Sequence, residues 1–497
     1  MKKALLIIYL VVVSFELTGL WAQTGNRPQD FLTAAFHKDR REQLRKRLPK
    51  NSVAVFFSNP ERNRSRDVDY PYHQDPDFYY LTGYREPHAV LFIFKEKQTA
   101  ADGTLYDEII FVQPRNIALE MRNGRRLGDI KTKEMLGLEQ AFNNTEFAKY
   151  KPDFSRFDQI LIFDFKNDVR DDPDNQSDLY DLIVTFKEKV NYPSPNAPRI
   201  KTEPEKNKLN TTELDVIMHD LRGIKTPDEI ALLRKAVAIS CMGQNEVMKA
   251  MKPGLSEREI QGIHEFVFKK YQAEEVGYPS IVGGGHNGCI LHYMENYKPA
   301  IEPKELVLMD LGAEYHGYTA DITRTVPASG KFSPEQKAIY DLVLRAQEDA
   351  MKICKPGTSF DDLKAATKVT INKGLKELGI IADENTPHQF YPHGCCHHIG
   401  LDVHDRGNYT TLQENMVITI EPGIYIPENA DCDKRWWGIA VRIEDDFLIT
   451  QNGYDHLSHL SPRTTEDIER LMKERSVLDD FVLPPVDTPT KQVPPKE

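Results

Sequence analysis

The sequence predicts an α+β protein in which a smaller α/β domain precedes a larger C-terminal domain made of two similar halves. Short strand-like runs alternate with amphipathic stretches in the first part of the chain, and one helix pattern occurs twice in the second part. Residues 191–208 are rich in Pro, Lys and Asn and separate the two parts as a linker. A chain of 497 residues is long enough for both domains, at ~100–200 residues per domain.

The composition excludes several classes of protein. The chain has 64 Lys and Arg against 76 Asp and Glu, a formal net charge of −12. Nucleic-acid-binding domains usually carry a basic face, so this balance argues against a nucleic-acid partner. With 40% hydrophobic and 28% charged residues, the chain resembles globular proteins rather than disordered or membrane proteins. Six cysteines are too few for a disulfide scaffold.

The two ends of the chain differ from the rest. Residues 1–22 contain a basic start, an apolar run over 4–15 and a small residue at Ala22, which together predict a cleaved signal peptide. The run is shorter than the ~20 residues that span a bilayer. We therefore expect bacterial export, to the periplasm or the medium, and no membrane span in the mature chain. Five prolines in residues 483–497 predict a disordered tail.

We expect the α/β domain over residues 29–200. Runs of apolar or β-branched residues predict four strands, at 52–58, 90–95, 108–113 and 159–164. Amphipathic stretches predict helices around 39–47 and 177–189.

The second domain is expected over residues 213–475. A capping box at Thr226-Pro227-Asp228-Glu229, with proline at the first helical position, predicts a helix that ends before Lys252-Pro253-Gly254. A second box at Ser256-x-x-Glu259 starts the next helix.

The same order returns about a hundred residues later. A box begins at Ser333, the helix stops at Lys355-Pro356-Gly357, and another helix starts at Ser359. We interpret the two units as halves of a duplicated domain, which would place a cleft between them.

Two carboxylates follow the first helix pair. Asp310 ends an apolar run, and Asp321 follows eleven residues later. Gly312 and His316-Gly317 between them predict a hairpin, which would bring both carboxylates together.

The second half carries His393, His397 and His404, followed by Glu421 and Glu444 inside β-branched runs. Burying a carboxylate is costly unless a cation or hydrogen bonds compensate it. Several converging carboxylates with one imidazole suit a pair of divalent ions such as Mn²⁺, Zn²⁺, Co²⁺ or Fe²⁺.

A structural reading competes for each of these residues taken singly, because an Asp at a strand end is most often a turn residue. The ordered occurrence of the whole set across both halves favours the metal site. A thiolate site at Cys395-Cys396 is disfavoured because the sequence has no CxxC partner.

Several motifs resemble aminopeptidase P, the Xaa-Pro aminopeptidase group of the pita-bread metallopeptidases. In the second domain they are Asn287-Gly288-Cys289-Ile290-Leu291-His292-Tyr293, Asp310-Leu311-Gly312, Asp321-Ile322-Thr323-Arg324-Thr325, His393-Gly394, His404-Asp405, Glu421-Pro422-Gly423 and Arg442-Ile443-Glu444-Asp445. In the first domain they are 77–84 and 124–128. The resemblance covers roughly residues 35–475 and implies a pita-bread catalytic domain behind an aminopeptidase P N-terminal domain.

The resemblance also implies a set of site residues. The metal ligands would be Asp310, Asp321, His397, Glu421 and Glu444. They would hold two divalent ions, Mn²⁺ in the first place and Zn²⁺ or Co²⁺ as alternatives, with a bridging hydroxide as the nucleophile. Glu421 would be the general base.

The other implied residues surround the metals. His292 and His404 would lie near the substrate carbonyl and His393 on the proline side. Arg442 and Tyr425 would orient the metal carboxylates, Tyr278 would lie beside a metal, and Asp67 would take part in proton transfer.

The implied substrates are peptides with proline at the second position, and the implied assembly is a homo-oligomer, either a dimer or a tetramer. Arg122 stands where the bacterial tetramer has a tryptophan. Two alternatives stay open. A prolidase would share every ligand but accept only dipeptides. A metal-free binding protein on the same fold is disfavoured by the complete ligand set.

Overall fold

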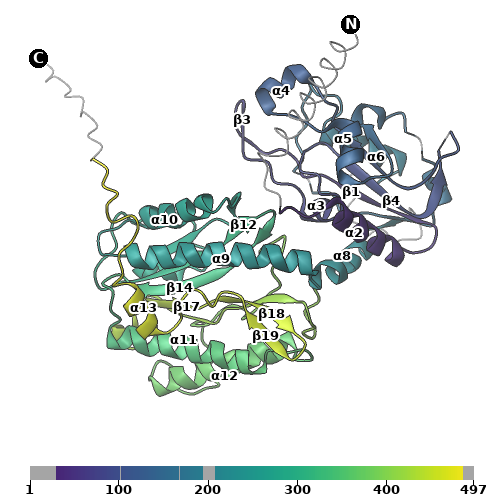
Figure 1. The fold of residues 1–497 in the computed structure, drawn as a ribbon. Helices are drawn as coiled ribbons and strands as arrows, with labels where there is room; N and C mark the ends of the chain where they lie inside the picture. Colours follow the sequence, from purple (N-terminus) through teal and green to yellow (C-terminus); the bar gives the residue numbers. More distant parts are fainter. Residues whose placement is uncertain (1–29, 101, 151, 167, 194–207, 485–497) are drawn as a thin grey trace, which may run out of the picture.

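The computed structural model describes residues 30–100, 102–150, 152–166, 168–193 and 208–484. The predicted signal peptide, most of the predicted linker, and the predicted tail apart from its first two residues lie outside these ranges. In the described ranges, none of the helices combines the length and the apolar character that a bilayer crossing requires. The chain forms two domains, and the predicted α+β class with a duplicated second domain is confirmed (Figure 1).

The first domain is built on a mixed six-stranded sheet. In sheet order its strands are β6 (Ala141–Asn143), β5 (Leu105–Val112), β4 (Val90–Thr99), β1 (Ser52–Phe57), β7 (Gln159–Leu161) and β8 (Leu209–Asn210). All four predicted strands are present, although β4 continues to Thr99 and β7 already ends at Leu161. Strand β8 pairs with β7 from beyond the expected linker, so residues after position 200 complete this sheet.

Helices and a small hairpin surround this sheet. The helices are α2 (Ala34–Arg47), α3 (Pro76–Thr82), α4 (Ile117–Asn123), α5 (Gly128–Leu136) and α6 (Leu179–Lys189), with short 3₁₀ turns η1 (Asn144–Glu146) and η2 (Phe154–Arg156). Helices α2 and α6 confirm the two predicted helices, but only α6 is clearly amphipathic, because the buried side of α2 includes the polar His37 and Arg41. The hairpin consists of β2 (Asn63–Ser65) and β3 (Val68–Asp69).

The second domain places its strands between two layers of helices (Figure 1). Helices α9 (Pro227–Ala250) and α10 (Glu257–Lys270) cover one face, and α11 (Pro334–Ile353) and α12 (Phe360–Glu377) cover the other. All four begin at the predicted caps, and each has a complete capping box. Helices α8 (Glu213–Gly223) and α13 (Thr465–Leu471) precede and follow this pair of layers.

The strands of the second domain form four small sheets. In the first half they are β10 (Ile281–Gly284), β11 (Leu306–Leu311) and β14 (Ile322–Pro327), and then β13 (Tyr318–Thr319), β12 (Ala313–Tyr315) and β9 (Glu275–Val276). In the second half they are β15 (Val417–Ile420), β18 (Asp445–Thr450) and β19 (Gly453–His456), and then β16 (Gly423–Ile426) and β17 (Ile439–Arg442). The 3₁₀ turns are η3 (Gly285–Cys289) and η4 (Lys434–Trp436).

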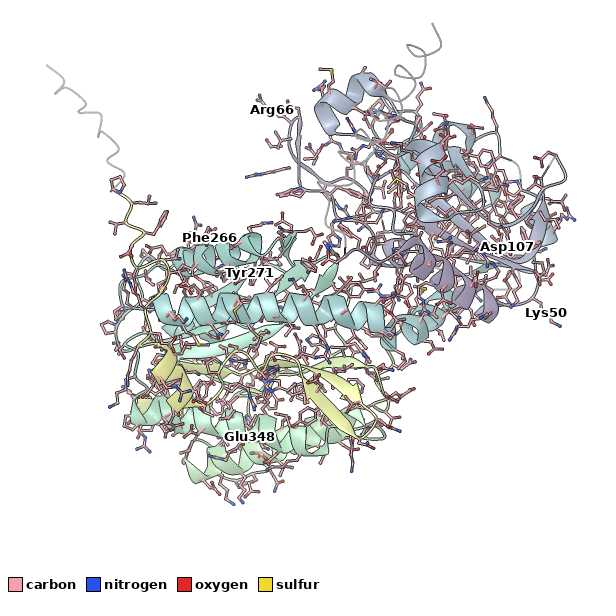
Figure 2. The ribbon with its side chains drawn as sticks, viewed as in Figure 1. Lys50, Arg66, Asp107, Phe266, Tyr271 and Glu348 are labelled. Carbon is pink, nitrogen blue, oxygen red and sulfur yellow. The ribbon has the colours of Figure 1, made fainter. Side chains whose placement is uncertain are left out.

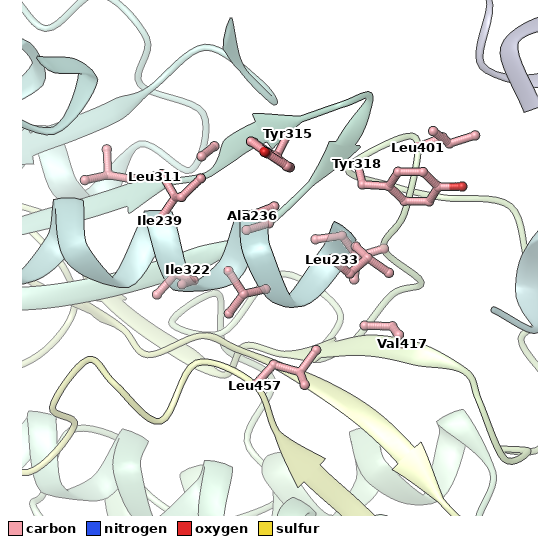
Figure 3. Close-up of a cluster of buried hydrophobic side chains, with 14 of the residues drawn as sticks. Leu233, Ala236, Ile239, Leu311, Tyr315, Tyr318, Ile322, Leu401, Val417 and Leu457 are labelled. Atoms are coloured by element: carbon pink, nitrogen blue, oxygen red, sulfur yellow. The ribbon is translucent and has the colours of Figure 1, made fainter. Parts of the chain in front are cut away.

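The apolar side of α9 forms the core over these strands. Leu233, Ala236 and Ile239 recur every three residues and face Leu311 and Ile322 (Figure 3). All five are essentially excluded from water, and burying a large aliphatic side chain contributes about 1.5–3 kcal/mol. The helix layers are therefore fixed tightly against the strands that carry the predicted site.

The first described residues are held against the second domain by one histidine. His316, in the β12–β13 turn, lies 2.7 Å from both Asp30 and Glu274, and the ring of Phe31 stacks on it. Burial opposes protonation of His316, but its contacts with Glu274 and Asp30 outweigh burial and raise its pKa above the usual value. Arg85 and Tyr315 also face this cluster, Arg85 over the ring of Phe31 and Tyr315 through a bond to Asp30.

This cluster predicts a loss of stability with rising pH. Since the pKa of His316 is raised in the folded state, its contribution is complete below the unfolded pKa of about 6.5 and is lost as the pH rises through the higher folded value. We expect His316→Asn to be less stable than wild type at pH 5.5, and the gap to shrink by pH 9. Asparagine tolerates the positive φ of 52° at this position. Urea unfolding of both proteins measures the gap, and a gap that widens with pH would contradict the prediction.

Candidate metal centre

Four carboxylates and one imidazole converge between the two halves of the second domain. Ligand atoms of Asp321, His397 and Glu444 all lie within 4.8 Å of one another. The Nε2 atom of His397 is 3.4 Å from Asp321, 3.6 Å from Glu421 and 3.8 Å from Glu444. Asp310 joins the group through Tyr278, whose hydroxyl lies 2.6 Å from one oxygen each of Asp310 and Asp321.

The predicted hairpin brings Asp310 and Asp321 together. Strands β12 and β13 form its end, and behind them β11 pairs with β14 so that Asp310 lies opposite Thr323. Gly312 is needed where the chain leaves β11, because a Cβ atom there would lie 2.0 Å from the carbonyl oxygen of Ala320.

The loop that follows α12 orients His397. Its Nδ1 atom lies 2.9 Å from the carbonyl oxygen of His398 and donates to it, so Nε2 faces the carboxylates. The backbone of Thr419 donates to the carbonyl of His397 at 2.9 Å, which fixes the loop to β15. An imidazole held in this way presents its Nε2 atom to the place where a metal would bind.

Burial and mutual repulsion make the ionised carboxylates of this cluster unfavourable without a cation. Burial, and then repulsion from Asp310, raise the pKa of Asp321 well above its usual value. Burial, and then repulsion from Asp321, do the same to the pKa of Glu444, and burial also raises the pKa of Glu421. Next to them, burial raises the pKa of Asp446 to about 8, and its Oδ1 atom finds no hydrogen-bond partner among the described residues. Divalent cations fit this donor set, because they would remove the repulsion that these groups suffer without them.

Arg442 ties the carboxylates of the two halves together. It donates to Asp310 at 2.6 Å, to the hydroxyl of Tyr425 at 2.9 Å and to the hydroxyl of Thr323 at 3.0 Å. Thr323 in turn donates to Glu444 at 2.6 Å. These contacts engage one oxygen each of Asp310 and Glu444 and restrict the orientation of those two side chains.

Three histidines stand at the edge of the cluster. The ring of His404 packs edge-on against His397, with centroids 4.5 Å apart. His393 lies 2.8 Å from the hydroxyl of Tyr425 and 3.7 Å from Glu421. His292 is exposed and lies close enough to depress the pKa of both other rings. Burial is the main cause that lowers the pKa of His393, to about 4, so this ring is neutral at pH 7.

A buried ion network positions the segment that carries His404. Arg222 in α8 is buried and pairs with Asp77 of the first domain at 2.7 Å, with Asp402 at 2.8 Å and with Asp405. Lys225 pairs with Asp405 at 2.8 Å. Burial opposes ionisation of Asp405, but Arg222 and Lys225 outweigh it and lower its pKa. The residue next to His404 is therefore anchored to both domains.

Asp67 is placed apart from this cluster. It lies in the exposed turn between β2 and β3, and Figure 2 shows its neighbour Arg66 at the outer tip of that hairpin. Among the described residues, no hydrogen bond or ion pair joins Asp67 to the other expected site residues.

Sequence reasoning missed two polar residues of the site. Thr323 links Arg442 to Glu444, and Asp446 accepts a hydrogen bond from the backbone of Asp321 at 3.1 Å. A signal for Asp446 was present, because three successive acidic residues inside the apolar run 441–449 are hard to explain as a solvated surface. Thr323 resembles any strand threonine and gives no such signal.

Comparisons with known proteins agree with this architecture. Residues 231–451 match Metallopeptidase family M24, and residues 37–161 match the Aminopeptidase P, N-terminal domain. The Xaa-Pro aminopeptidase of Escherichia coli is 36% identical over 450 residues, which cover 87% of this chain and 96% of that protein. The human Xaa-Pro aminopeptidase 3 is 32% identical over 438 residues, covering 86% and 82%. A solved structure of E. coli aminopeptidase P with the inhibitor Pro-Leu matches with a TM-score of 0.77 and 33% identity, covering 89% of this chain and 98% of that one.

The fold and the carboxylate–imidazole cluster define a metallopeptidase of the pita-bread type. Within that class the chain belongs to the aminopeptidase P family, since both of its domains match and the similarity extends over most of its length. It is a metallo-aminopeptidase, a hydrolase.

Proposed function

We propose that this enzyme removes the first residue from peptides whose second residue is proline. The observation that carries the proposal is the cluster of four carboxylates and one imidazole between the halves, with three histidines at its edge. Relatives named Xaa-Pro aminopeptidase support the choice of substrate.

The site residues we propose as metal ligands are Asp310, Asp321, His397, Glu421 and Glu444. They would hold two divalent ions, with Mn²⁺ as the first choice and Zn²⁺ or Co²⁺ as alternatives, because carboxylates with one imidazole suit all three. When bound, such a pair supplies Lewis acidity and a hydroxide nucleophile at neutral pH.

The chain's own side chains would transfer the proton, stabilise the oxyanion and contact the substrate. Glu421 is the general base that takes a proton from the attacking water and passes it to the leaving nitrogen. His404 and His292 would donate to the developing oxyanion, and the neutral His393 would face the proline side.

A peptide bond to the nitrogen of proline requires a dedicated enzyme because of two properties of proline. Its nitrogen carries no N–H once it is in a peptide bond, and its ring fixes φ. Tyr425 and Arg442 would keep the metal carboxylates in place without contacting that nitrogen. Asp67, in the exposed turn between β2 and β3, stays a prediction as a residue for proton transfer.

Two further proposals concern the setting of the enzyme. Residues 1–22 have the layout of a signal peptide, so we propose export to the periplasm or the medium. We also propose a homo-oligomer, either a dimer or a tetramer, on the resemblance to the family.

A peptide panel with metal-stripped and metal-restored enzyme tests the function. We expect cleavage of Xaa-Pro-Xaa tripeptides and longer Xaa-Pro peptides, loss of activity after chelation, and recovery with added Mn²⁺. Matched Xaa-Ala peptides serve as the control and should be cleaved much more slowly. Cleavage of Xaa-Pro dipeptides alone would indicate a prolidase instead, and activity that survives chelation would overturn the metal assignment.

A further inference from the structure

Two buried glutamines occupy equivalent places in the two halves of the catalytic domain. Gln244 lies in α9 and Gln347 in α11, and neither side chain is exposed to water. Each stands eight residues before the lysine of the Lys-Pro-Gly that ends its helix unit, Lys252 or Lys355. The internal duplication therefore places the same side chain on both helix layers.

Each glutamine donates from its amide nitrogen to two backbone carbonyls. Gln244 reaches the carbonyls of Met309 at 3.1 Å and Ile322 at 2.8 Å. Gln347 reaches those of Ile420 at 3.0 Å and Ile443 at 3.3 Å.

All four carbonyls belong to residues adjacent to the expected ligands. Met309 precedes Asp310, Ile322 follows Asp321, Ile420 precedes Glu421 and Ile443 precedes Glu444. Each helix therefore joins, through one amide group, the two backbone segments that carry two carboxylates. Gln244 bonds to the backbone beside Asp310 and Asp321, and Gln347 bonds to the backbone beside Glu421 and Glu444.

Three of the four carbonyls lie at or next to a strand end, and Met309 lies inside β11. Ile322 opens β14, Ile420 ends β15, and Ile443 lies between β17 and β18. Arg463 donates to the Oε1 atom of Gln347 at 2.7 Å. The nitrogen of Gln347 also lies 2.9 Å from Asp445, so its two N–H groups are shared among three acceptors. The bonded amide thus has one orientation, with its donors toward the strands.

We propose that Gln244 and Gln347 are positioning residues that set the separation of the carboxylates in each half, and thereby the affinity and the geometry of the metal site. This inference rests on the proposed metal site. Neither glutamine contacts an expected ligand side chain in the contacts described here, so each acts through the backbone rather than as a ligand or a catalytic group.

Metal binding by the full mature chain tests the proposal. Gln244→Met and Gln347→Met keep the length of the side chain and remove both donors. Titration of metal-stripped protein with Mn²⁺ should show affinity reduced by ~10–100-fold in each variant, as for other residues that orient metal ligands. The visible spectrum of the Co²⁺-loaded protein should shift, because it reports ligand geometry rather than stability. Gln244→Asn and Gln347→Asn, whose amides are one methylene too short to span both carbonyls, replace the methionine variants if these do not fold.

Two buried positions on the same helix layers supply matched controls. Leu342 of α11 packs on Gly374 of α12, where a Cβ atom would lie 2.2 Å from it, and Phe268 of α10 packs on Gly243 of α9. We expect Leu342→Ala and Phe268→Leu to lower the melting temperature while leaving the Mn²⁺ affinity and the Co²⁺ spectrum unchanged.

The outcomes separate this inference from the proposed function. The positioning role would be overturned if the glutamine variants kept the wild-type Mn²⁺ affinity and Co²⁺ spectrum. It would also be overturned if the control variants lost Mn²⁺ affinity to the same extent. Wild-type protein that binds Mn²⁺ but does not cleave Xaa-Pro peptides would overturn the function, and the affinities would still decide the role of the glutamines. Failure of the wild type to bind Mn²⁺, Zn²⁺ or Co²⁺ would overturn both.

Discussion

Asp321→Asn is expected to abolish most of the activity and, at the same time, to stabilise the metal-free protein. Asp321 is buried, and repulsion from Asp310, Asp446 and Glu421 adds to burial in raising its pKa. Asparagine has nearly the same shape, and its oxygen can still accept from Tyr278. It removes one negative charge from a cluster that has too many when no cation is present.

With metal bound, the effect of Asp321→Asn on stability should be the opposite, and the variant should be less stable than the wild type. The proposed role of Asp321 is to bind both ions, and loss of a ligand should cost more than the ~10–100-fold that is lost with a residue that only orients a ligand. Melting temperatures of variant and wild type, in chelator and in saturating Mn²⁺, measure the two changes in stability. The kcat/KM for an Xaa-Pro peptide measures the activity. Asp455→Asn, on the surface of the same domain, is the matched control and should change neither. A variant that is less stable than wild type in chelator would refute the repulsion argument.

Arg324→Met is expected to destabilise the protein by about 3–5 kcal/mol, the cost of leaving a buried charge without its partner. Arg324 is fully buried and uses all five of its N–H groups, bonding to Asp445 at 2.6 Å and to four backbone carbonyls. Two of those carbonyls belong to Thr323 and Glu444, beside the metal cluster. Burial opposes ionisation of Asp445, but Arg324, His456 and Arg463 together outweigh burial and lower the pKa of this carboxyl.

Chemical denaturation of the two proteins measures the loss. Arg435→Met is the control, because Arg435 is exposed and its contact with Asp433 is 3.8 Å long, so we expect a change within about 0.5 kcal/mol. The double variant Arg324→Met with Asp445→Leu should recover part of the loss, since both buried charges are then absent. A single variant as stable as the control would show that the buried pair contributes little.

The helices of the catalytic domain were predictable because the signals for their ends are local. Capping boxes at Thr226, Ser256, Ser333 and Ser359 each need only three residues of context, and all four form. Strand β8 was not predictable, because two residues become a strand only through pairing with β7 across the linker.

In the candidate site, too, the features set by local sequence were predictable and those set by distant contacts were not. The hairpin between Asp310 and Asp321 followed from glycines within eleven residues, and it is confirmed. The roles of the ligands remain predictions. The contacts of Thr323 and of Gln244 were out of reach, because their partners lie far along the chain, 121 residues away for Glu444 and 65 for Met309. Such polar contacts depend on the packed fold, which residue patterns do not specify.

The ion network around Arg222 has a consequence for engineering the enzyme. Arg222 belongs to the second domain by sequence, yet one of its carboxylate partners, Asp77, comes from the first, and Arg406 also pairs with Asp77 at 2.9 Å. A shortened catalytic fragment would expose this charged surface and release the segment that carries His404. The amino-terminal domain is thus a part of the catalytic scaffold that cannot be trimmed away, and a useful minimal enzyme must retain both.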